Sequence, residues 1–383
     1  MRIGIVGGGI AGLTTALACA RRRMDVTVYE RAPELGEIGA GIQIGANGMA
    51  VMTALGLAEA VRGAGVTPAQ VQMRSAAGTL LMQVPMGGEA MRRWGHAPVN
   101  LHRADLIAIL AVAARAAGVR IVTGMAPGCA QASEGILHVG EVAEQFDYVI
   151  GADGVRSELR AQVVGLTEPR YTGYAAWRAV VPHRDAGAVT TLTVGADRHL
   201  VTYPIRGGTV LNVVAVIKRP EWTGEGWAQE DDADNLRQAF DGWNDTADQV
   251  LSNVWSTHLW GLFDHAPLAQ WSQGKLVLVG DACHPMLPFL AQGASQGLED
   301  AWVLAHTLAE SGTPAEYEAL RKPRATKVQR AARNQGRLDH IGFPLRPFVH
   351  LGMRLVGRLA PEFAAGRFDW LYGHDVTAVK SRG

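Results

Sequence analysis

The spacing of apolar residues changes along the chain and outlines its elements. Residues 2–6, RIGIV, form a short apolar run with β-branched residues and predict a buried strand. Over residues 10–23, IAGLTTALACARRR, apolar positions recur at helical spacing. Residues 25–30, DVTVYE, predict a second strand. A strand, a helix and a strand in this order are typical of a βαβ unit with parallel strands.

Three later segments continue this alternation of strands and helices. An amphipathic helix is predicted over 101–118 and a strand over 119–124. Residues 146–160 begin as a buried strand and then break into a tight turn. Residues 274–285 again predict a buried strand ending in a small residue and an aspartate, and a helix follows over 294–310. We expect these segments to belong to the same domain as the first βαβ unit.

The pattern between about 171 and 270 lacks this alternation. Strand-like pieces such as HLVTYPI (199–205) and TVLNVVAVI (209–217) dominate there, and residues 71–84 predict two more strands around a glycine turn. The tail from residue 313 is helical and rich in arginine. The chain is therefore expected to insert a separate, sheet-based domain into the α/β domain.

Composition and charge favour a small-molecule partner. The 383 residues suffice for two closely associated domains, and 36 basic and 36 acidic residues leave no net charge. This balance gives no general attraction to nucleic acid or a membrane surface, and no run of 18 apolar residues predicts a membrane span. Cys19, Cys129 and Cys283 form neither a CxxC pair nor a disulfide framework. We expect a cytoplasmic monomer or homodimer without a metal site.

A glycine fingerprint joins the first strand to the first helix. Gly7, Gly9 and Gly12 fit GxGxxG, in which the first glycine allows a tight turn, the second lets a pyrophosphate approach, and the third lets helix and strand pack closely. Glu30 ends the second strand 18 residues beyond Gly12, where a ribose hydroxyl would lie. The residues expected to bind a dinucleotide here are Gly7, Gly9, Ile10, Ala11, Gly12 and Glu30.

The segment after Glu30 favours FAD over NAD as the resident cofactor. Residues 30–48, ERAPELGEIGAGIQIGANG, form a long glycine-rich loop instead of a prompt return to another βα unit. Such a loop, which includes Gln43, could lay backbone along an extended cofactor. The alternative is a plain surface loop.

The expected fold class is therefore α/β: a Rossmann-like FAD-binding domain with an inserted, mainly β substrate domain and a C-terminal helical tail. We assign residues 1–72, 98–170 and 271–312 to the FAD-binding domain, 73–97 and 171–270 to the substrate domain, and 313–383 to the tail.

Three motifs in order carry a resemblance to a known family. GGGIAG (7–12), GADGVRS (151–157) and GDACHP (280–285) resemble the motifs of single-component FAD-dependent aromatic hydroxylases, the group A flavoprotein monooxygenases. The similarity extends over nearly the whole chain, including YTGYAAWRAVVP (171–182) and FDWLYGHDV (368–376). Within this family the chain looks most like salicylate hydroxylase and the enzymes for 3-hydroxybenzoate and 6-hydroxynicotinate.

The resemblance implies an activity and its cosubstrates. Members use NADH or NADPH and O2 to hydroxylate an aromatic ring through a flavin C4a-hydroperoxide. The substrate expected here is salicylate or a related hydroxybenzoate, with loss of carbon dioxide if salicylate becomes catechol. Hydroxynicotinate and urate are alternative rings. An FAD oxidase or dehydrogenase, and a non-catalytic flavin-binding sensor, are alternative functions.

The resemblance also implies cofactor-binding residues beyond the glycine turn. Arg31 would lie near the adenine, Arg103 near the middle of FAD, and Asp153 in a segment used by both FAD and NAD(P)H. Asp281 would bind the ribityl chain or a water on the pyrophosphate. Residues 288–295, among them Pro288, Gly293, Ala294 and Ser295, would run past the isoalloxazine. Other interpretations stay open: Asp153 could cap a helix, and Arg103 could cap or salt-bridge at a helix start.

Hydroxylation of a phenol favours a base beside the substrate hydroxyl, and His199 and Tyr203 are the candidates. Four residues apart on a predicted strand, they share one face. A histidine suits a base or proton relay, and the tyrosine a hydrogen bond to the phenol. The same spacing occurs in the relatives that act on hydroxylated benzoates and nicotinates. The alternative is two structural residues on an edge strand.

Three further features complete the expected site. Pro288 and its apolar neighbours would keep water from the reacting oxygen, and backbone N–H groups of residues 293–295 would stabilise negative charge on reduced flavin. A substrate carboxylate could bind Arg178, Arg198 or Arg206, among which the sequence does not choose. Cys283 and His284 are adjacent and lack further ligands nearby, so we expect a packing cysteine and a turn histidine near the cofactor.

Overall fold

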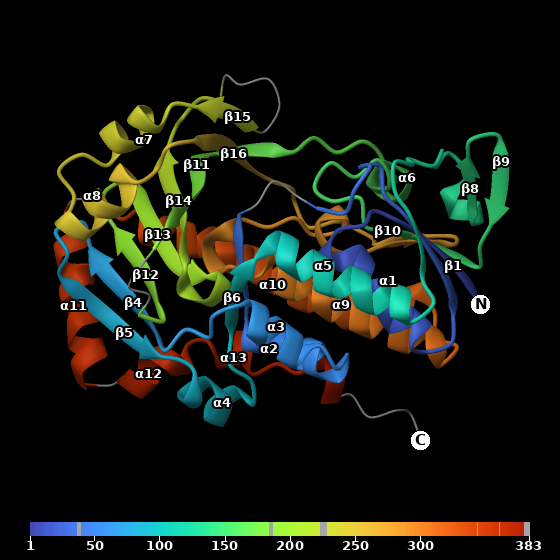
Figure 1. Ribbon diagram of the computed structural model, residues 1–383, viewed down its shortest axis with the longest axis horizontal. Helices are drawn as coiled ribbons and strands as arrows, with labels where there is room; N and C mark the ends of the chain where they lie inside the picture. Colours follow the sequence, from blue (N-terminus) through green and yellow to red (C-terminus); the bar gives the residue numbers. More distant parts are fainter. Residues whose placement is uncertain (37–39, 184–186, 223–227, 343, 360, 379–383) are drawn as a thin grey trace.

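Two sheets organise the protein, and the helices pack around them. The computed structural model describes residues 1–36, 40–183, 187–222, 228–342, 344–359 and 361–378. Figure 1 shows a sheet around β1 and β10 at the right, a larger sheet at the left, and a layer of long helices running beside both. The predicted α/β class is confirmed.

The smaller sheet contains the βαβ unit that the sequence predicts. Its strands, in spatial order, are β17 (Ser272–Gln273), β18 (Leu276–Leu278), β10 (Tyr148–Gly151), β1 (Arg2–Val6), β2 (Asp25–Tyr29) and β7 (Arg120–Val122). Neighbouring strands pair in parallel except β17 with β18. Helices α1 (Ile10–Ala20), α5 (Arg103–Ala116) and α9 (Gly293–Ala309) contribute to the same hydrophobic core. The carboxyl ends of β1 and β10 meet at one edge, where open α/β sheets bind ligands.

The larger sheet is almost entirely antiparallel. Its eight strands, in spatial order, are β15 (Ala228–Asp231), β16 (Thr257–Asp264), β11 (Arg170–Pro182), β14 (Val210–Lys218), β13 (Arg198–Ile205), β12 (Val189–Val194), β4 (Gln70–Ser75) and β5 (Leu80–Pro85). Only β12 and β4 run parallel. The two strands predicted around a glycine turn at 71–84 are therefore β4 and β5, with Gly78 in the left-handed region.

Alternation along the strands gives the larger sheet two different faces. On β13, Leu200 packs into a core formed with α7 (Ala233–Ala239) and α8 (Asp245–Ser252), where Leu236 and Phe240 are fully buried. His199, Val201 and Tyr203 point to the other face, which lines a cavity. The sheet thus uses one face for stability and the other for the site.

The remaining elements connect and cover the sheets. Two-stranded sheets pair β3 (Gly41–Ile44) with β6 (Val99–His102) and β8 (Ile136–Val139) with β9 (Val142–Gln145). The other helices are α2 (Ala46–Ala54), α3 (Ala58–Ala64), α4 (Gly88–Trp94), α6 (Leu159–Val164), α10 (Pro314–Asp339), α11 (Arg346–Leu359), α12 (Pro361–Gly366) and α13 (Asp369–Tyr372). Within the described residues, no helix is both long and apolar enough to cross a membrane.

Three predicted boundaries differ from the structure. The helix predicted over 10–23 ends at Ala20, and the next three residues form a turn in which Arg23 has φ 63°. The helix predicted over 101–118 starts at Arg103, because Leu101 and His102 pair with β3 and the His102 side chain then accepts the Ala104 N–H. The loop predicted over 30–48 contains β3 and the start of α2; residues 37–39 lie outside the described residues.

Candidate active site

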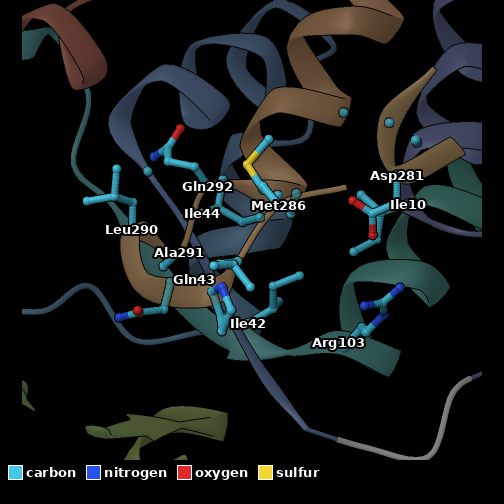
Figure 2. A pocket seen from close by; sticks show the side chains of 18 of the residues that line it. Ile10, Ile42, Gln43, Ile44, Arg103, Asp281, Met286, Leu290, Ala291 and Gln292 are labelled. Atoms are coloured by element: carbon cyan, nitrogen blue, oxygen red, sulfur yellow. The ribbon is translucent and has the colours of Figure 1, made fainter. Parts of the chain in front are cut away.

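A cavity of about 640 Å³ is lined by residues from both sheets. Its wall includes the carboxyl ends of β1, β2 and β10, the strand β3, and the inner face of β12, β13 and β14. Figure 2 shows part of it, with Ile10, Asp281 and Arg103 grouped on one side and Leu290, Ala291 and Gln292 on the other. A volume of this size is typical of small-molecule and cofactor sites.

The glycine turn has the geometry that the fingerprint predicts. Gly7 has φ 112°, and a Cβ there would lie 2.2 Å from the Ala152 carbonyl oxygen. A Cβ at Gly12 would lie 2.0 Å from the Gly7 oxygen, so strand and helix approach each other closely. A Cβ at Gly9 would meet nothing within 4 Å, and Gly9 lines the cavity. The turn therefore fits a cofactor pyrophosphate, which needs open backbone at this position.

Glu30 and Arg31 lie on the cavity wall directly after β2. The Glu30 carboxylate accepts the Gly8 N–H at 2.7 Å and the Ala32 N–H at 2.9 Å. It is thus fixed at the glycine turn, and a carboxylate has lone pairs to spare for a ribose hydroxyl. Ile10 and Ala11, on the first turn of α1, also line the cavity.

Asp153 caps a helix and also lies on the cavity wall. Its Oδ2 accepts the N–H groups of Glu158 at 2.9 Å and Leu159 at 3.3 Å, so it caps the start of α6. Its Oδ1 is buried and has no hydrogen-bond partner among the described residues, and the residue as a whole lines the cavity. A buried acceptor without a donor fits a ligand hydroxyl or N–H. Asp281, in the short 3-10 turn Gly280–Ala282, faces the same cavity.

The other residues predicted to bind the cofactor come from three elements. Arg103 begins α5, and Gln43 lies on β3; both line the cavity, and Figure 2 shows both. The Gln43 amide donates to Asn100 Oδ1 at 3.0 Å, which orients it. At the start of α9, Gly293 and Ala294 line the cavity. Ser295 does not: its hydroxyl accepts the Gly45 N–H at 3.1 Å and is fully buried.

The strand β13 brings His199 and Tyr203 to one face of the cavity, together with Val201. His199 Nδ1 lies 2.7 Å from His340 Nε2, and the two rings stack at 4.8 Å between centroids. Phe289, from the turn Pro288–Leu290, contacts both rings edge-on. Burial lowers the pKa of His199 well below its ordinary value and that of His340 from 6.5 to about 4. Both imidazoles are therefore neutral near pH 7.

Tyr203 and Arg178 complete this end of the cavity. Burial raises the pKa of the Tyr203 phenol, so it stays protonated and able to donate a hydrogen bond. Of the three arginines considered for a substrate carboxylate, Arg178 on β11 lines the cavity. Arg206 pairs with Asp105 at 3.0 Å, and Arg198 donates to the Ala239 carbonyl. Of these three arginines, Arg178 is thus the one that a ligand in the cavity could reach.

Cys283 and His284 lie away from the cavity wall. Both are buried, and His284 Nε2 lies 2.5 Å from Asp300 Oδ2. Burial raises the pKa of the Cys283 thiol well above its ordinary value, which keeps it unreactive. The expected packing cysteine fits this geometry, but the expected turn histidine near the cofactor is instead part of a buried network. No cluster of potential metal ligands occurs in the part of the chain that the structure describes.

The buried network that contains His284 and Asp300 also reaches the cavity wall, and the sequence did not predict it. Arg321 on α10 donates to Asp300 Oδ1 at 2.8 Å and to Glu299 Oε2 at 2.5 Å. Glu299 also accepts from Asn47 at 2.6 Å, and Asn47 donates to Gln292, a residue of the cavity wall, at 3.0 Å. Gln335 and Asp339 on α10 line the cavity as well. Their spacing of four predicts a shared helix face, but the sequence does not tell which face meets a site.

We expect the neutral histidine pair to make stability depend on pH. The unfolded chain takes up a proton on each histidine near pH 6.5, whereas the folded protein does so only at lower pH. The free energy of unfolding should therefore fall as the pH drops from about 6.5 towards 4, by up to about 1.4 kcal/mol per pH unit for each histidine. When measured by denaturant unfolding between pH 7 and 4.5, the free energy of unfolding should fall less steeply for His340→Gln than for the wild-type protein. Equal slopes would mean that folded His340 is already protonated.

Comparisons with known proteins define the class. Residues 1–332 match a family model described as an FAD binding domain. The chain belongs to the FAD-dependent group A flavoprotein monooxygenases, and it is an FAD-dependent aromatic monooxygenase. The predictions of family, FAD binding and enzyme class are confirmed, which sets aside the oxidase and sensor alternatives.

Individual relatives differ in the substrate that their names give. The chain is 34% identical to 3-amino-4-hydroxybenzoate 2-monooxygenase of Streptomyces platensis over 100% of this chain and 98% of that protein. It is 35% identical to salicylate hydroxylase of Pseudomonas putida, covering 98% of this chain and 93% of the relative. A solved structure of Klebsiella pneumoniae HpxO with FAD and uric acid matches with a TM-score of 0.83 and 25% identity, covering 97% and 96% of the two chains.

Proposed function

We propose that the protein uses NADH or NADPH and O2 to hydroxylate a hydroxybenzoate, with salicylate as the reference substrate. The observation that carries this proposal is that Arg178 lies on the cavity wall together with His199 and Tyr203. The side chains of His199 and Tyr203 can both form a hydrogen bond with a phenol. A ring with one carboxylate and one hydroxyl matches this set of groups. The two enzymes compared above as relatives act, by their names, on aromatic acids.

Arg178 is proposed to bind the substrate carboxylate. A guanidinium offers two parallel N–H donors to a carboxylate, and such charge-assisted pairs are stronger than neutral hydrogen bonds. The cavity face around it is apolar, with Val201, Val214 and Val216 on the neighbouring strands. Low polarity around the pair strengthens it and suits the flat faces of an aromatic ring.

His199 and Tyr203 are proposed to handle the substrate hydroxyl. His199 uses Nδ1 for His340, so Nε2 is the nitrogen left to accept the phenol proton. Because its pKa is low, His199 holds that proton only briefly and acts as a relay toward His340. Tyr203 keeps its own proton and donates to the phenol oxygen. Partial removal of the phenol proton makes the ring more nucleophilic, which is what attack on an electrophilic oxygen needs.

The remaining residues are proposed to hold FAD and to keep water out. FAD, when bound, would take electrons from NAD(P)H and activate O2, which is the source of the oxygen atom. Glu30 binds the adenosine ribose, Asp281 the ribityl chain, and the N–H groups of Gly293 and Ala294 lie at the positive end of the α9 dipole, where they stabilise negative charge. Pro288 belongs to the apolar turn that excludes water from the reacting centre.

Replacing Arg178 by glutamine should weaken salicylate binding by about 10- to 100-fold, since a hydrogen bond to a charged group contributes about 1.5–3 kcal/mol. The dissociation constant is measured from the change in flavin absorbance on titrating the holoenzyme. Arg206→Gln is the matched control, because Arg206 pairs with Asp105 outside the cavity and should leave the constant unchanged. Equal effects of the two variants, or none from Arg178→Gln, would contradict the carboxylate site.

A further inference from the structure

The carboxyl of Asp339 is unlike the other buried acids of the described chain. Asp264, Glu299 and Asp300 are each paired with at least one arginine. Asp339 is 5% exposed, forms no salt bridge in the described residues, and accepts a single hydrogen bond, from Gln335 Nε2 to Oδ1 at 2.7 Å. Burial raises the pKa of this carboxyl from 3.8 to about 7. Burying an acid with one neutral partner is unfavourable, and such groups concentrate at functional sites.

The position of Asp339 places it on the substrate side of the cavity. Asp339 ends α10, and both it and Gln335 line the cavity wall. Between them lies Gly336, where a Cβ would be 2.5 Å from the Phe289 ring. The end of α10 therefore packs directly against the Pro288–Leu290 turn. His340, the next residue, contacts His199.

The Asp339 carboxyl fits a ligand that donates a hydrogen bond. Gln335 occupies Oδ1, while Oδ2 has no donor among the described residues, and a carboxylate oxygen accepts up to two hydrogen bonds. An amino or hydroxyl substituent on an aromatic ring is neutral, small and flat enough for an apolar cavity. It would supply the missing donor without a second charge.

We propose that Asp339 contacts the substrate and accepts a hydrogen bond from an amino or hydroxyl group on its ring. Gln335 is a positioning residue that holds the carboxyl in place. The inference rests on the proposed function, which supplies the aromatic acid, and adds a second recognition point besides Arg178. The enzyme should therefore prefer rings that carry this donor over the same rings without it.

The test compares two pairs of ligands on holoenzyme: 3-amino-4-hydroxybenzoate with 4-hydroxybenzoate, and 2,3-dihydroxybenzoate with salicylate, so that a hydroxyl for His199 and Tyr203 is present in every ligand. In each pair one ligand lacks one donor group. For the wild-type protein, the dissociation constant measured from flavin absorbance should be lower for the ring with the additional donor in at least one pair. Asp339→Asn should reduce that preference by about 10-fold or more, because its amide NH2 faces the donor once Oδ1 keeps the Gln335 bond.

Controls separate recognition from folding. Asp339→Asn removes a buried charge without a cationic partner, so its unfolding temperature should be equal to or above that of the wild type. Asp241→Asn makes the same change at an exposed residue and should leave both preferences unchanged. Unchanged preferences in Asp339→Asn, with wild-type protein still hydroxylating aromatic acids, would overturn the Asp339 contact alone. Wild-type protein that binds none of the four rings would contradict the proposed function and this inference together.

Discussion

Replacing Gly9 by alanine should weaken the binding of FAD while leaving the fold intact. A Cβ at this position would meet nothing within 4 Å, and the φ of −76° at Gly9 is allowed for alanine. The substitution should therefore introduce neither a clash nor backbone strain. The methyl group would instead occupy the space where the pyrophosphate is proposed to approach the N-terminus of α1. Loss of one charge-assisted hydrogen bond there corresponds to about a 10- to 100-fold weaker affinity for FAD.

Two measurements separate binding from stability in this variant. The flavin content of the purified protein and its dissociation constant for added FAD should change, whereas the unfolding temperature of the apoprotein should not. Gly63→Ala is the matched control, because Gly63 on α3 also has open space for a Cβ but lies off the cavity wall. If Gly9→Ala retains wild-type FAD affinity, the pyrophosphate does not lie where the fingerprint predicts.

Replacing Arg321 by methionine should destabilise the protein by about 3–5 kcal/mol. The Arg321 side chain is 1% exposed and lies between Glu299 and Asp300, both fully buried. Methionine fills a similar volume but removes the charge that compensates two carboxylates in a medium of low polarity. Arg324 still pairs with Glu299 and His284 with Asp300, so the lower end of the range is expected.

The free energy of unfolding in denaturant measures this effect. Arg330→Met is the control, since Arg330 lies on the same helix and is exposed, and it should change stability by less than about 0.5 kcal/mol. Because Asn47 and Gln292 connect the network to the cavity wall, the Arg321 variant should also bind FAD less tightly. A loss below about 1 kcal/mol would show that the network does not support the fold.

The grouping of residues around the glycine turn could be predicted because its signals are local. Gly7, Gly9 and Gly12 occupy a strand-to-helix turn whose geometry depends on a few consecutive residues. Asp153 and Asp281 follow buried strands, and the ends of parallel strands meet at one edge of a sheet. His199 and Tyr203 share a face because strands alternate with period two.

The substrate half depended on contacts between distant segments. Arg178, Arg198 and Arg206 look alike in sequence, and only the packing of β11 against its neighbours puts the first of them on the cavity wall. His340 and Asp339 reach the site from the end of α10. His340 lies 141 residues after His199 in the sequence. Ser295, whose backbone N–H is predicted near the flavin, uses its hydroxyl to accept the Gly45 N–H, a contact that the sequence does not indicate. Such partners are set by tertiary packing rather than by local pattern.

The most direct test follows the oxygen atom. Holoenzyme is supplied with 18O2, NADH or NADPH, and a panel of salicylate, 3-hydroxybenzoate, 3-amino-4-hydroxybenzoate, 6-hydroxynicotinate and urate, and products and hydrogen peroxide are quantified. We expect at least one hydroxybenzoate to yield a ring product with one 18O atom, in an amount that matches the reduced nicotinamide consumed. Oxidation of the nicotinamide matched by hydrogen peroxide, with no labelled product from any hydroxybenzoate, would contradict the proposed function.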